Sequence, residues 1–418
     1  MRRLIFRAFP VVLIAMSLML ALWRRGESVP LYAARTGLMC QTCHFDPNGG
    51  GPRNEFGFGF ARSRHSLEPE DSTSQWHDLS IGNRVGESMP LYFGINQRLM
   101  LLATKRTDQD SLERLGFFNM ENAVHLAFQP HPRLTLVYSF DAFSTGPSNI
   151  VRGKEAFGMI GGLPVNGYVK AGRFRTPFGL RLDDHTVATR SGYLDFTTGQ
   201  MFLPYDSRFP DMGVEIGMER NGIFGRAAFT DGESNVFSGQ YAGAKTLKIG
   251  YNRPEYQGAI SFYDDYRKES FSGVKRATRW GYYGMTHYRR AVLMGEIAAG
   301  TDEAEPPFGM ATGAKVNRLA GYVEADYAPT RALNFRVRYD HMDLVRDGAE
   351  VVGTTVPGLT NSELNSHDRY ALEGEIVPVP FAELRWALRR INHKADKDPF
   401  GTPIPDENQA YLQVHFSY

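Results

Sequence analysis

The chain has 418 residues, and its 47 basic and 46 acidic side chains leave a formal net charge of +1. A balance this close to neutral does not favour a nucleic-acid-binding protein, and none is expected as a partner. The mean hydropathy is −0.35. No stretch beyond the N-terminus approaches the roughly 20 apolar residues of a membrane-spanning helix, so a multi-helix membrane protein is excluded. The 43 glycines, 20 tyrosines and 28 phenylalanines favour many strands and tight turns.

The first 28 residues are expected to be an export signal. Three arginines within the first seven residues precede an apolar run over residues 8–23, which is the order of charged and hydrophobic regions in a secretory signal. The alternative is a short membrane anchor, because Arg24 and Arg25 follow the run at once. We interpret residues 1–28 as a signal peptide, so the chain is predicted to leave the cytoplasm.

The two cysteines of the sequence belong to one motif. Cys40, Cys43 and His44 form C-x-x-C-H, the attachment signature of c-type haem. Two thiols on one turn can add to the two haem vinyl groups, which leaves the imidazole of His44 beneath the iron as an axial ligand. A disulfide, a redox dithiol and a zinc site are the alternatives. A redox dithiol expects a thioredoxin-like βαβ context, and a zinc finger needs a second Cys or His pair. We therefore predict one covalent haem c.

The sixth iron ligand is expected between the motif and the first strand. His or Met supplies this ligand in most electron-transfer haems, and His65, His77 and Met89 are the candidates. We favour His65 as the possible sixth ligand; its alternative is a solvated polar histidine. Met39, beside the first cysteine, is expected to pack against the macrocycle.

Residues 29–67 are predicted to form the haem segment. They contain too little apolar material for a core of their own, and segments this small usually need a covalent or metal staple. The haem would supply that apolar centre, and its glycines would let the backbone approach closely. Four aromatic side chains are expected to pack on it: Phe45, Phe56, Phe58 and Phe60. Residues 68–88, rich in Glu, Asp, Ser and Gly, are interpreted as a linker.

Residues 89–418 show the two-residue alternation of strands with one apolar and one polar face. In the last nine residues the apolar face comprises Ala410, Leu412, Val414, Phe416 and Tyr418, and the other face Tyr411, Gln413, His415 and Ser417. Around residues 333–340 and 383–389 the second face is charged. In a soluble sandwich the apolar faces would meet across a shared core. In an outer-membrane barrel they meet lipid, and the polar faces line water.

Connection lengths favour the barrel. Short turns such as Asn221-Gly222 and Arg253-Pro254 alternate with long polar loops, as in barrels with short periplasmic turns and long outer loops. The terminal Tyr418 resembles the C-terminal signal of bacterial outer-membrane proteins. We predict an all-β fold with an antiparallel outer-membrane β-barrel over 89–418 whose strands lie near residues 90–103, 116–129, 134–145, 155–163, 167–175, 212–220, 223–230, 243–252, 255–264, 280–288, 291–300, 318–328, 332–343, 366–377, 381–393 and 409–418.

The longest irregular stretch covers about residues 176–211. Loops of this length in compact barrels are often functional or folded into the lumen, and a solvated surface loop is the alternative. The run entering it, Gly172–Arg181, resembles the G-x-F-x-x-P-F-G-L segment of phosphate-selective-type porins.

The chain as a whole resembles the outer-membrane monohaem cytochrome-porin fusions of iron-oxidising bacteria. These proteins join a signal peptide, a short lead into C-x-x-C-H, a cluster of asparagine, phenylalanine and glycine, and a barrel of about sixteen strands. The glycine-rich run from Asp46 to Pro52 departs from this pattern and looks more like cytochrome-porins without an established donor. The matching positions are Arg35, Thr36, Gly37, Cys40, Cys43, His44, Asn54, Phe56, Gly57 and Phe60.

The resemblance implies a function. The haem would take electrons from an extracellular metal ion such as ferrous iron and pass them to a periplasmic c-type cytochrome, in a protein of the bacterial outer membrane whose wall contacts lipid. The apolar band of such a barrel is roughly 25 Å tall, so we expect the haem segment at the mouth or in the lumen, as a plug. One alternative is an anion-preferring diffusion porin with a structural or regulatory haem, motivated by lumen-facing Arg336, Arg338, Arg385 and Arg389. Another is a haem enzyme such as a peroxidase.

Overall fold

The computed structural model describes residues 29–68, 82–86, 89–141, 153–182, 187–190, 210–232, 243–266, 274–304, 315–347, 367–393 and 405–418. The predicted signal peptide (1–28) and most of the predicted linker, with His77, lie outside these residues. Of the linker, Asn83 donates a hydrogen bond to the Arg53 carbonyl of the predicted haem segment at 2.9 Å, and its own carbonyl accepts from the Phe93 N–H at 2.8 Å, so residues 82–86 join that segment to the start of the barrel. Among the described residues, no helix is both long enough and apolar enough to cross a membrane.

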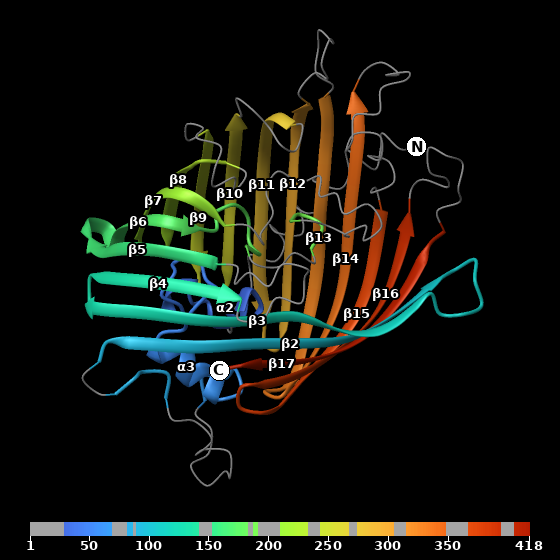
Figure 1. Ribbon diagram of the computed structural model, residues 1–418, viewed down its shortest axis with the longest axis horizontal. Coiled ribbons are helices and arrows are strands. Elements are labelled where there is room, and N and C mark those ends of the chain that lie inside the picture. The colour runs from blue at the N-terminus through green and yellow to red at the C-terminus, as the bar shows by residue number, and fades with distance from the viewer. Residues whose placement is uncertain are drawn as a thin grey trace.

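Sixteen antiparallel strands, counted over the described ranges, close into a barrel (Figure 1). Each strand pairs with the next, and the last pairs with the first, so the alternative of two packed sheets is excluded. All sixteen predicted strands are present, with ends that differ by a few residues. They are β2 (Leu91–Arg106), β3 (Arg114–His131), β4 (Leu134–Asp141), β5 (Gly153–Leu163), β6 (Gly167–Phe174), β7 (Asp211–Arg220), β8 (Ile223–Thr230), β9 (Ala244–Arg253), β10 (Tyr256–Tyr266), β11 (Val274–Tyr288), β12 (Ala291–Ala304), β13 (Lys315–Thr330), β14 (Leu333–Asp347), β15 (His367–Val379), β16 (Ala382–His393) and β17 (Glu407–Ser417).

The two faces of the wall follow the predicted alternation. On β17, Leu412 is 44% exposed and Phe416 52% exposed on the outside, whereas Gln413, His415 and Ser417 are buried toward the lumen. The short turns follow from local chemistry as well. Between β7 and β8, Asn221 and Gly222 both have positive φ, as the tight hairpin turn that suits twisted strands requires.

The segment before the barrel lies inside it. Helix α2 (Val29–Thr36), the single turn η1 (Cys40–Thr42) and helix α3 (Glu55–Arg62) occupy the lumen toward the end where the C-terminus lies (Figure 1). Leu31 of α2 packs in one apolar cluster with Met285, Met294 and Tyr322 of the wall. The segment therefore plugs the barrel, and we call residues 29–68 the plug.

The run that departs from the cytochrome-porin pattern fastens the plug to the wall. Asp46 accepts hydrogen bonds from the Lys170 ammonium at 3.2 Å. The Asn48 amide donates to Glu215 at 2.9 Å and accepts from Arg226 at 2.7 Å. All five side chains are buried, so this polar cluster, here called the plug anchor, holds the glycine-rich loop against β6, β7 and β8.

The apolar side chains of the plug pack mainly against the barrel wall. The expectation that the four phenylalanines of this segment pack on one centre is therefore wrong. Phe45 packs against Tyr92 of β2, with ring centroids 4.9 Å apart. Phe58 stacks on Phe381 at 5.1 Å and meets Tyr418 edge-on at 5.2 Å. Phe56 is 46% exposed. Only Phe60 of the four lines the interior cavity described next. A closed wall provides apolar contacts that an isolated segment would need from a haem.

Candidate functional site in the barrel lumen

Cys40, Cys43, His44 and His65 line one cavity between the plug and the wall. Its volume is about 270 Å³, slightly below the roughly 300–1,000 Å³ of small-molecule sites. All four side chains singled out from the sequence are thus brought together. Met89, the other described candidate for the sixth ligand, is 49% exposed and lies away from the cavity lining.

The C-x-x-C-H motif forms a single tight turn. The backbone N–H groups of Cys43 and His44 both donate to the Cys40 carbonyl, at 3.1 and 3.0 Å. The two cysteines are not joined in a disulfide. Burial, reinforced by the neighbouring Cys40, raises the pKa of the Cys43 thiol to about 11. Reactive redox thiols have lowered pKa values, so this environment does not favour the redox-dithiol alternative.

Asn54 and Gly57 lock the motif to helix α3. The Asn54 side chain caps the helix by accepting from the Gly57 N–H at 2.9 Å, and its amide donates to the Thr42 carbonyl at 3.0 Å. Its backbone N–H donates to the Cys43 carbonyl at 3.1 Å. A Cβ on Gly57 would overlap that same carbonyl oxygen. The cap at Asn54 and the close contact at Gly57 therefore fix the position of α3 relative to the C-x-x-C-H turn.

His65 reaches the cavity through an unusual backbone at the end of α3. Arg64 and His65 have φ values of 53° and 58°, in the left-handed region that non-glycine residues seldom adopt. The His65 N–H donates to the Phe60 carbonyl at 3.0 Å, which closes this turn. Such backbone strain persists only where surrounding contacts determine it, and it clusters at functional sites. Here it turns the His65 ring back toward helix α2.

The His65 ring is buried between polar and aromatic partners. Its Nδ1 lies 2.6 Å from the Tyr32 hydroxyl and 3.8 Å from Oε1 of Glu383. The Tyr32 and His65 rings lie 4.5 Å apart at 36°. Burial lowers the pKa of His65 to about 4, against an opposing effect of Glu383. The imidazole is therefore neutral at physiological pH, which is the form that binds metals.

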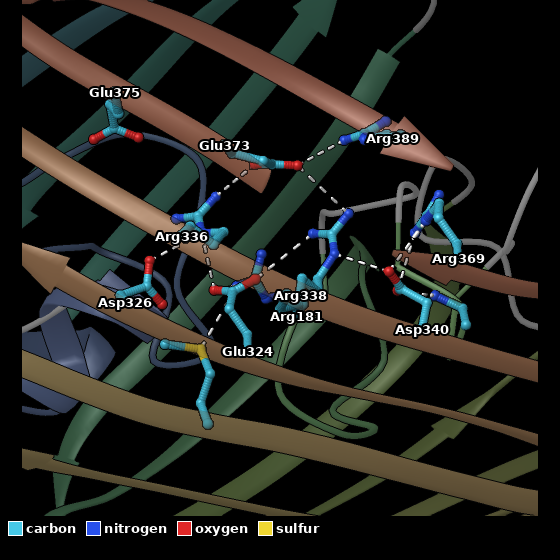
Figure 2. A network of polar contacts seen from close by, with 12 residues as sticks. Arg181, Glu324, Asp326, Arg336, Arg338, Asp340, Arg369, Glu373, Glu375 and Arg389 are labelled. Atoms are coloured by element: carbon cyan, nitrogen blue, oxygen red, sulfur yellow. Dashed lines mark hydrogen bonds and ion pairs between the residues drawn. The ribbon is translucent and has the colours of Figure 1, made fainter. Parts of the chain in front are cut away.

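The wall beside the cavity is strongly charged, and its charges are paired. Figure 2 shows Arg336, Arg338 and Arg389 turned toward Glu373. Arg336 and Arg389 lie 3.2 and 3.0 Å from that carboxylate. Arg385 pairs with Glu375 at 2.6 Å. The four arginines expected to line an anion path are all held by lumen carboxylates, so they present much less uncompensated positive charge than their number suggests.

The stretch after β6 folds into the lumen over the residues described, 176–182 and 187–190. Gly179 has φ +69°, and a Cβ there would overlap Glu296 of the wall. Leu180 N–H donates to Glu296 at 3.1 Å, and Arg181 pairs with Glu324 (Figure 2). Leu180 and Leu182 line the cavity, and Leu180 packs against the apolar clusters that include Leu31 and Met39 of the plug. The lumen-folded alternative is thus confirmed for these residues; Asp183, Asp184, His185, Asp195, Asp206 and Arg208 lie outside the described ranges.

Sequence reasoning missed three residues of the site: Tyr32, Glu375 and Glu383. Tyr32 lies in the plug but belongs to no motif. The two glutamates are more than three hundred residues away, and only the strand register places them beside His65. Their alternation with apolar neighbours shows that they face the lumen, but not which part of the plug they meet. Among the described residues, no group of three or more His, Cys, Asp and Glu side chains could hold a metal ion by itself.

No protein-family model and no curated protein sequence matches the chain. Solved structures do resemble it. The outer membrane channel DcaP of Acinetobacter baumannii superposes with a TM-score of 0.56 at 10% identity, covering 78% of this chain and 97% of that one. An anion-selective porin from Comamonas acidovorans gives 0.55 at 8% identity, with 78% and 99% covered. Salmonella typhi OmpF gives 0.52 at 12% identity, with 79% and 98% covered. These likenesses show the fold: a sixteen-stranded barrel of the outer-membrane porin type.

Proposed function

We propose that the protein is an outer-membrane electron-transfer barrel carrying one covalent haem c in its lumen. The observation that carries this proposal is that Cys40, Cys43, His44 and His65 line a single cavity inside a closed barrel. Three of these residues belong to the attachment motif, and the fourth approaches from the far end of α3. The spacing of the motif does not require His65 to lie in this cavity. Its position beside the motif is therefore independent support for the proposal.

The side chains present fit a haem. The two thiols lie on one turn, as thioether bonds require, and a Cβ on Gly49 would lie 3.3 Å from the Cys40 sulfur, so the backbone is close to the attachment point. His44 and the buried, neutral His65 would hold the iron. When bound, the haem would supply reversible one-electron chemistry. A second axial histidine favours electron transfer over the peroxidase alternative, which needs an open position on the iron.

The barrel wall would serve as an insulating sleeve around this site. Its apolar band is roughly 25 Å tall, and a site in the lumen shortens the path between donor and acceptor. The donor expected from the family resemblance is extracellular ferrous iron, and the acceptor is a periplasmic c-type cytochrome. The plug would separate the two aqueous sides, because Asp46 and Asn48 fasten it to the wall.

The test is electron flow across a sealed membrane. Purified protein is reconstituted into liposomes that enclose oxidised cytochrome c, and ferrous iron is added outside. Reduction of the enclosed cytochrome should depend on the protein and should disappear in the double variant Cys40→Ser/Cys43→Ser. Flow retained by the double variant would contradict the proposal.

A second candidate is an anion-preferring diffusion porin whose haem is structural or regulatory. The likeness to DcaP and to an anion-selective porin supports this function better than it supports electron transfer. Planar-bilayer conductance distinguishes the two. A diffusion porin gives a steady conductance with anion preference, whereas the plugged electron-transfer barrel gives little conductance to small ions.

A further inference from the structure

We propose that Tyr32 is a positioning residue for the sixth ligand: its hydroxyl, held against Glu375, accepts the Nδ1 proton of His65 and leaves Nε2 of that ring to bind the iron. This inference rests on the proposed function, because it concerns how the chain holds a haem ligand. Tyr32 belongs to no sequence motif and enters only through its contacts in the lumen.

A short chain of hydrogen bonds runs from the His65 ring through Tyr32 to Glu375 of the barrel wall. The Tyr32 hydroxyl lies 2.6 Å from His65 Nδ1, and it donates to Glu375 Oε1 at 3.4 Å. The side chain of Tyr32 is buried in the lumen, and its hydroxyl lies between the His65 ring and the Glu375 carboxylate. Glu375 is buried too, and Arg385 pairs with its other oxygen at 2.6 Å. The carboxylate is therefore a fixed acceptor on β15.

The direction of the hydrogen bonds follows from counting protons. A tyrosine hydroxyl has one proton, and a carboxylate is the stronger acceptor for it. If Tyr32 donates to Glu375, its oxygen must accept from His65. Oε1 of Glu383, 3.8 Å from the same Nδ1, is also an acceptor. Both neighbours of Nδ1 thus favour a proton on that nitrogen, and the lone pair of the neutral ring is left on Nε2.

This arrangement has the chemistry of an outer-shell partner of a metal-binding histidine. Such histidines almost always donate their other ring N–H to a carboxylate, a carbonyl or water, which fixes the tautomer, orients the ring and makes it a stronger donor to the metal. Tyr32 does this through its hydroxyl, and its ring packs against the His65 ring at a tilt of 36°, with centroids 4.5 Å apart. Phe60 packs edge-on against Tyr32, with centroids 5.4 Å apart, and lies 6.0 Å from the His65 ring.

The structure also offers a matched control. The Tyr92 hydroxyl donates a hydrogen bond to the Glu55 carboxylate at 3.2 Å, as the Tyr32 hydroxyl does to Glu375. Tyr92 packs on Phe45 and is not among the residues that line the cavity of His65. The substitutions Tyr32→Phe and Tyr92→Phe remove the same atom at two places, and Glu375→Gln and Glu55→Gln form a second matched pair.

The experiment compares haem-loaded wild type and these variants by optical spectrum, midpoint potential and competition with added imidazole. We expect Tyr32→Phe to remain low-spin with a raised midpoint potential, because a less basic ligand stabilises ferric iron less. Imidazole should displace His65 at about tenfold lower concentration, the lower end of what losing an outer-shell partner costs. Glu375→Gln should shift both quantities the same way by less, and Tyr92→Phe and Glu55→Gln should match wild type.

The outcomes separate the two proposals. If wild type carries no covalent haem, the proposed function fails. If wild type is a low-spin haem protein but Tyr32→Phe has the potential and imidazole sensitivity of Tyr92→Phe, the role of Tyr32 is refuted while the proposed function stands. If Tyr32→Phe does not load haem, the comparison of Glu375→Gln with Glu55→Gln is the test. Equal midpoint potentials and equal imidazole sensitivities in these two variants overturn the inference. A shift of both quantities in Glu375→Gln supports it.

Discussion

Gly57 of helix α3 lies directly against the carbonyl group of Cys43, so closely that a side-chain carbon at this position would overlap the carbonyl oxygen. Asn54, three residues earlier, joins the same two elements by hydrogen bonds. The attachment motif and the helix that leads to His65 are therefore one rigid unit. A change at this crossing should move the motif relative to His65.

The variant Gly57→Ala is expected to lose most of its covalent haem. The added methyl must push the helix away from the motif, and overpacking of this kind costs about 1–3 kcal/mol. Gly59→Ala is the control, because a Cβ there has nothing within 4 Å and alanine is the better helix former. Haem content per polypeptide, measured by absorbance, checks the prediction. Equal loss in both variants would mean that helix propensity, and not the contact with Cys43, is responsible.

The plug anchor should keep the lumen closed. Removing both of its plug side chains, in Asp46→Ala/Asn48→Ala, takes away the side-chain contacts of the loop with the wall, while Lys170 and Glu215 stay paired with each other at 3.0 Å. We expect a higher single-channel conductance in planar bilayers than wild type shows. The control is Glu68→Ala, which breaks an exposed pair with Arg331. A conductance that stays at the wild-type level in the double variant would show that the loop does not hold the plug.

The ion pairs of the wall are expected to matter for stability according to their burial. Glu373 holds Arg336 and Arg389 and is buried, so Glu373→Gln should destabilise the barrel by about 3–5 kcal/mol. Glu55→Gln removes a pair whose carboxylate side chain is 65% exposed, and it should change stability by less than about 1 kcal/mol. Urea unfolding in lipid vesicles measures both. Similar midpoints for the two variants would contradict the lumen position of Glu373.

A charged side chain on the outer face should reduce the folding free energy most when it lies near the middle of the wall. Val337 is 60% exposed on the outside of β14, and Val337→Lys is expected to cost about 2–4 kcal/mol of folding free energy in lipid. Leu115, 64% exposed at the start of β3, is the control, because Lys near the membrane interface costs only about 0–1 kcal/mol. Unfolding in vesicles compares them. Equal costs would mean that Val337 does not face the hydrocarbon.

The barrel could be predicted because its signal is local and repeated. Alternation such as that of Leu412, Gln413 and Val414 assigns each residue to a face without knowledge of distant contacts, and hairpin turns such as Asn221-Gly222 fix the register between neighbours. Strand ends at the long loops were less accurate: β11 begins at Val274, not near residue 280. Several polar residues there continue the pairing of β10 with β11, although alternation alone does not mark them as strand.

The site could be predicted where its residues share a motif or have the side-chain type of an iron ligand. Covalent haem attachment requires two cysteines and a histidine at this spacing. The motif of Cys40, Cys43 and His44 can therefore be recognised from the sequence alone. His65 was chosen for its residue type, and the structure brings it to the same cavity. Tyr32 and Glu375 could not be found in this way, because their meeting depends on how a plug docks in a barrel. The phenylalanines were misassigned for the same reason: Phe45 and Phe58 pack against the barrel wall, which the sequence of the segment alone does not reveal.

The most direct test of the account is the intact mass of the mature protein, produced in a host that attaches c-type haem. We predict the mass of the polypeptide plus one haem, and the mass of the bare polypeptide for Cys40→Ser/Cys43→Ser. A mature wild-type chain with no added haem mass, isolated under conditions in which a known c-type cytochrome from the same host is loaded, would contradict the central claim.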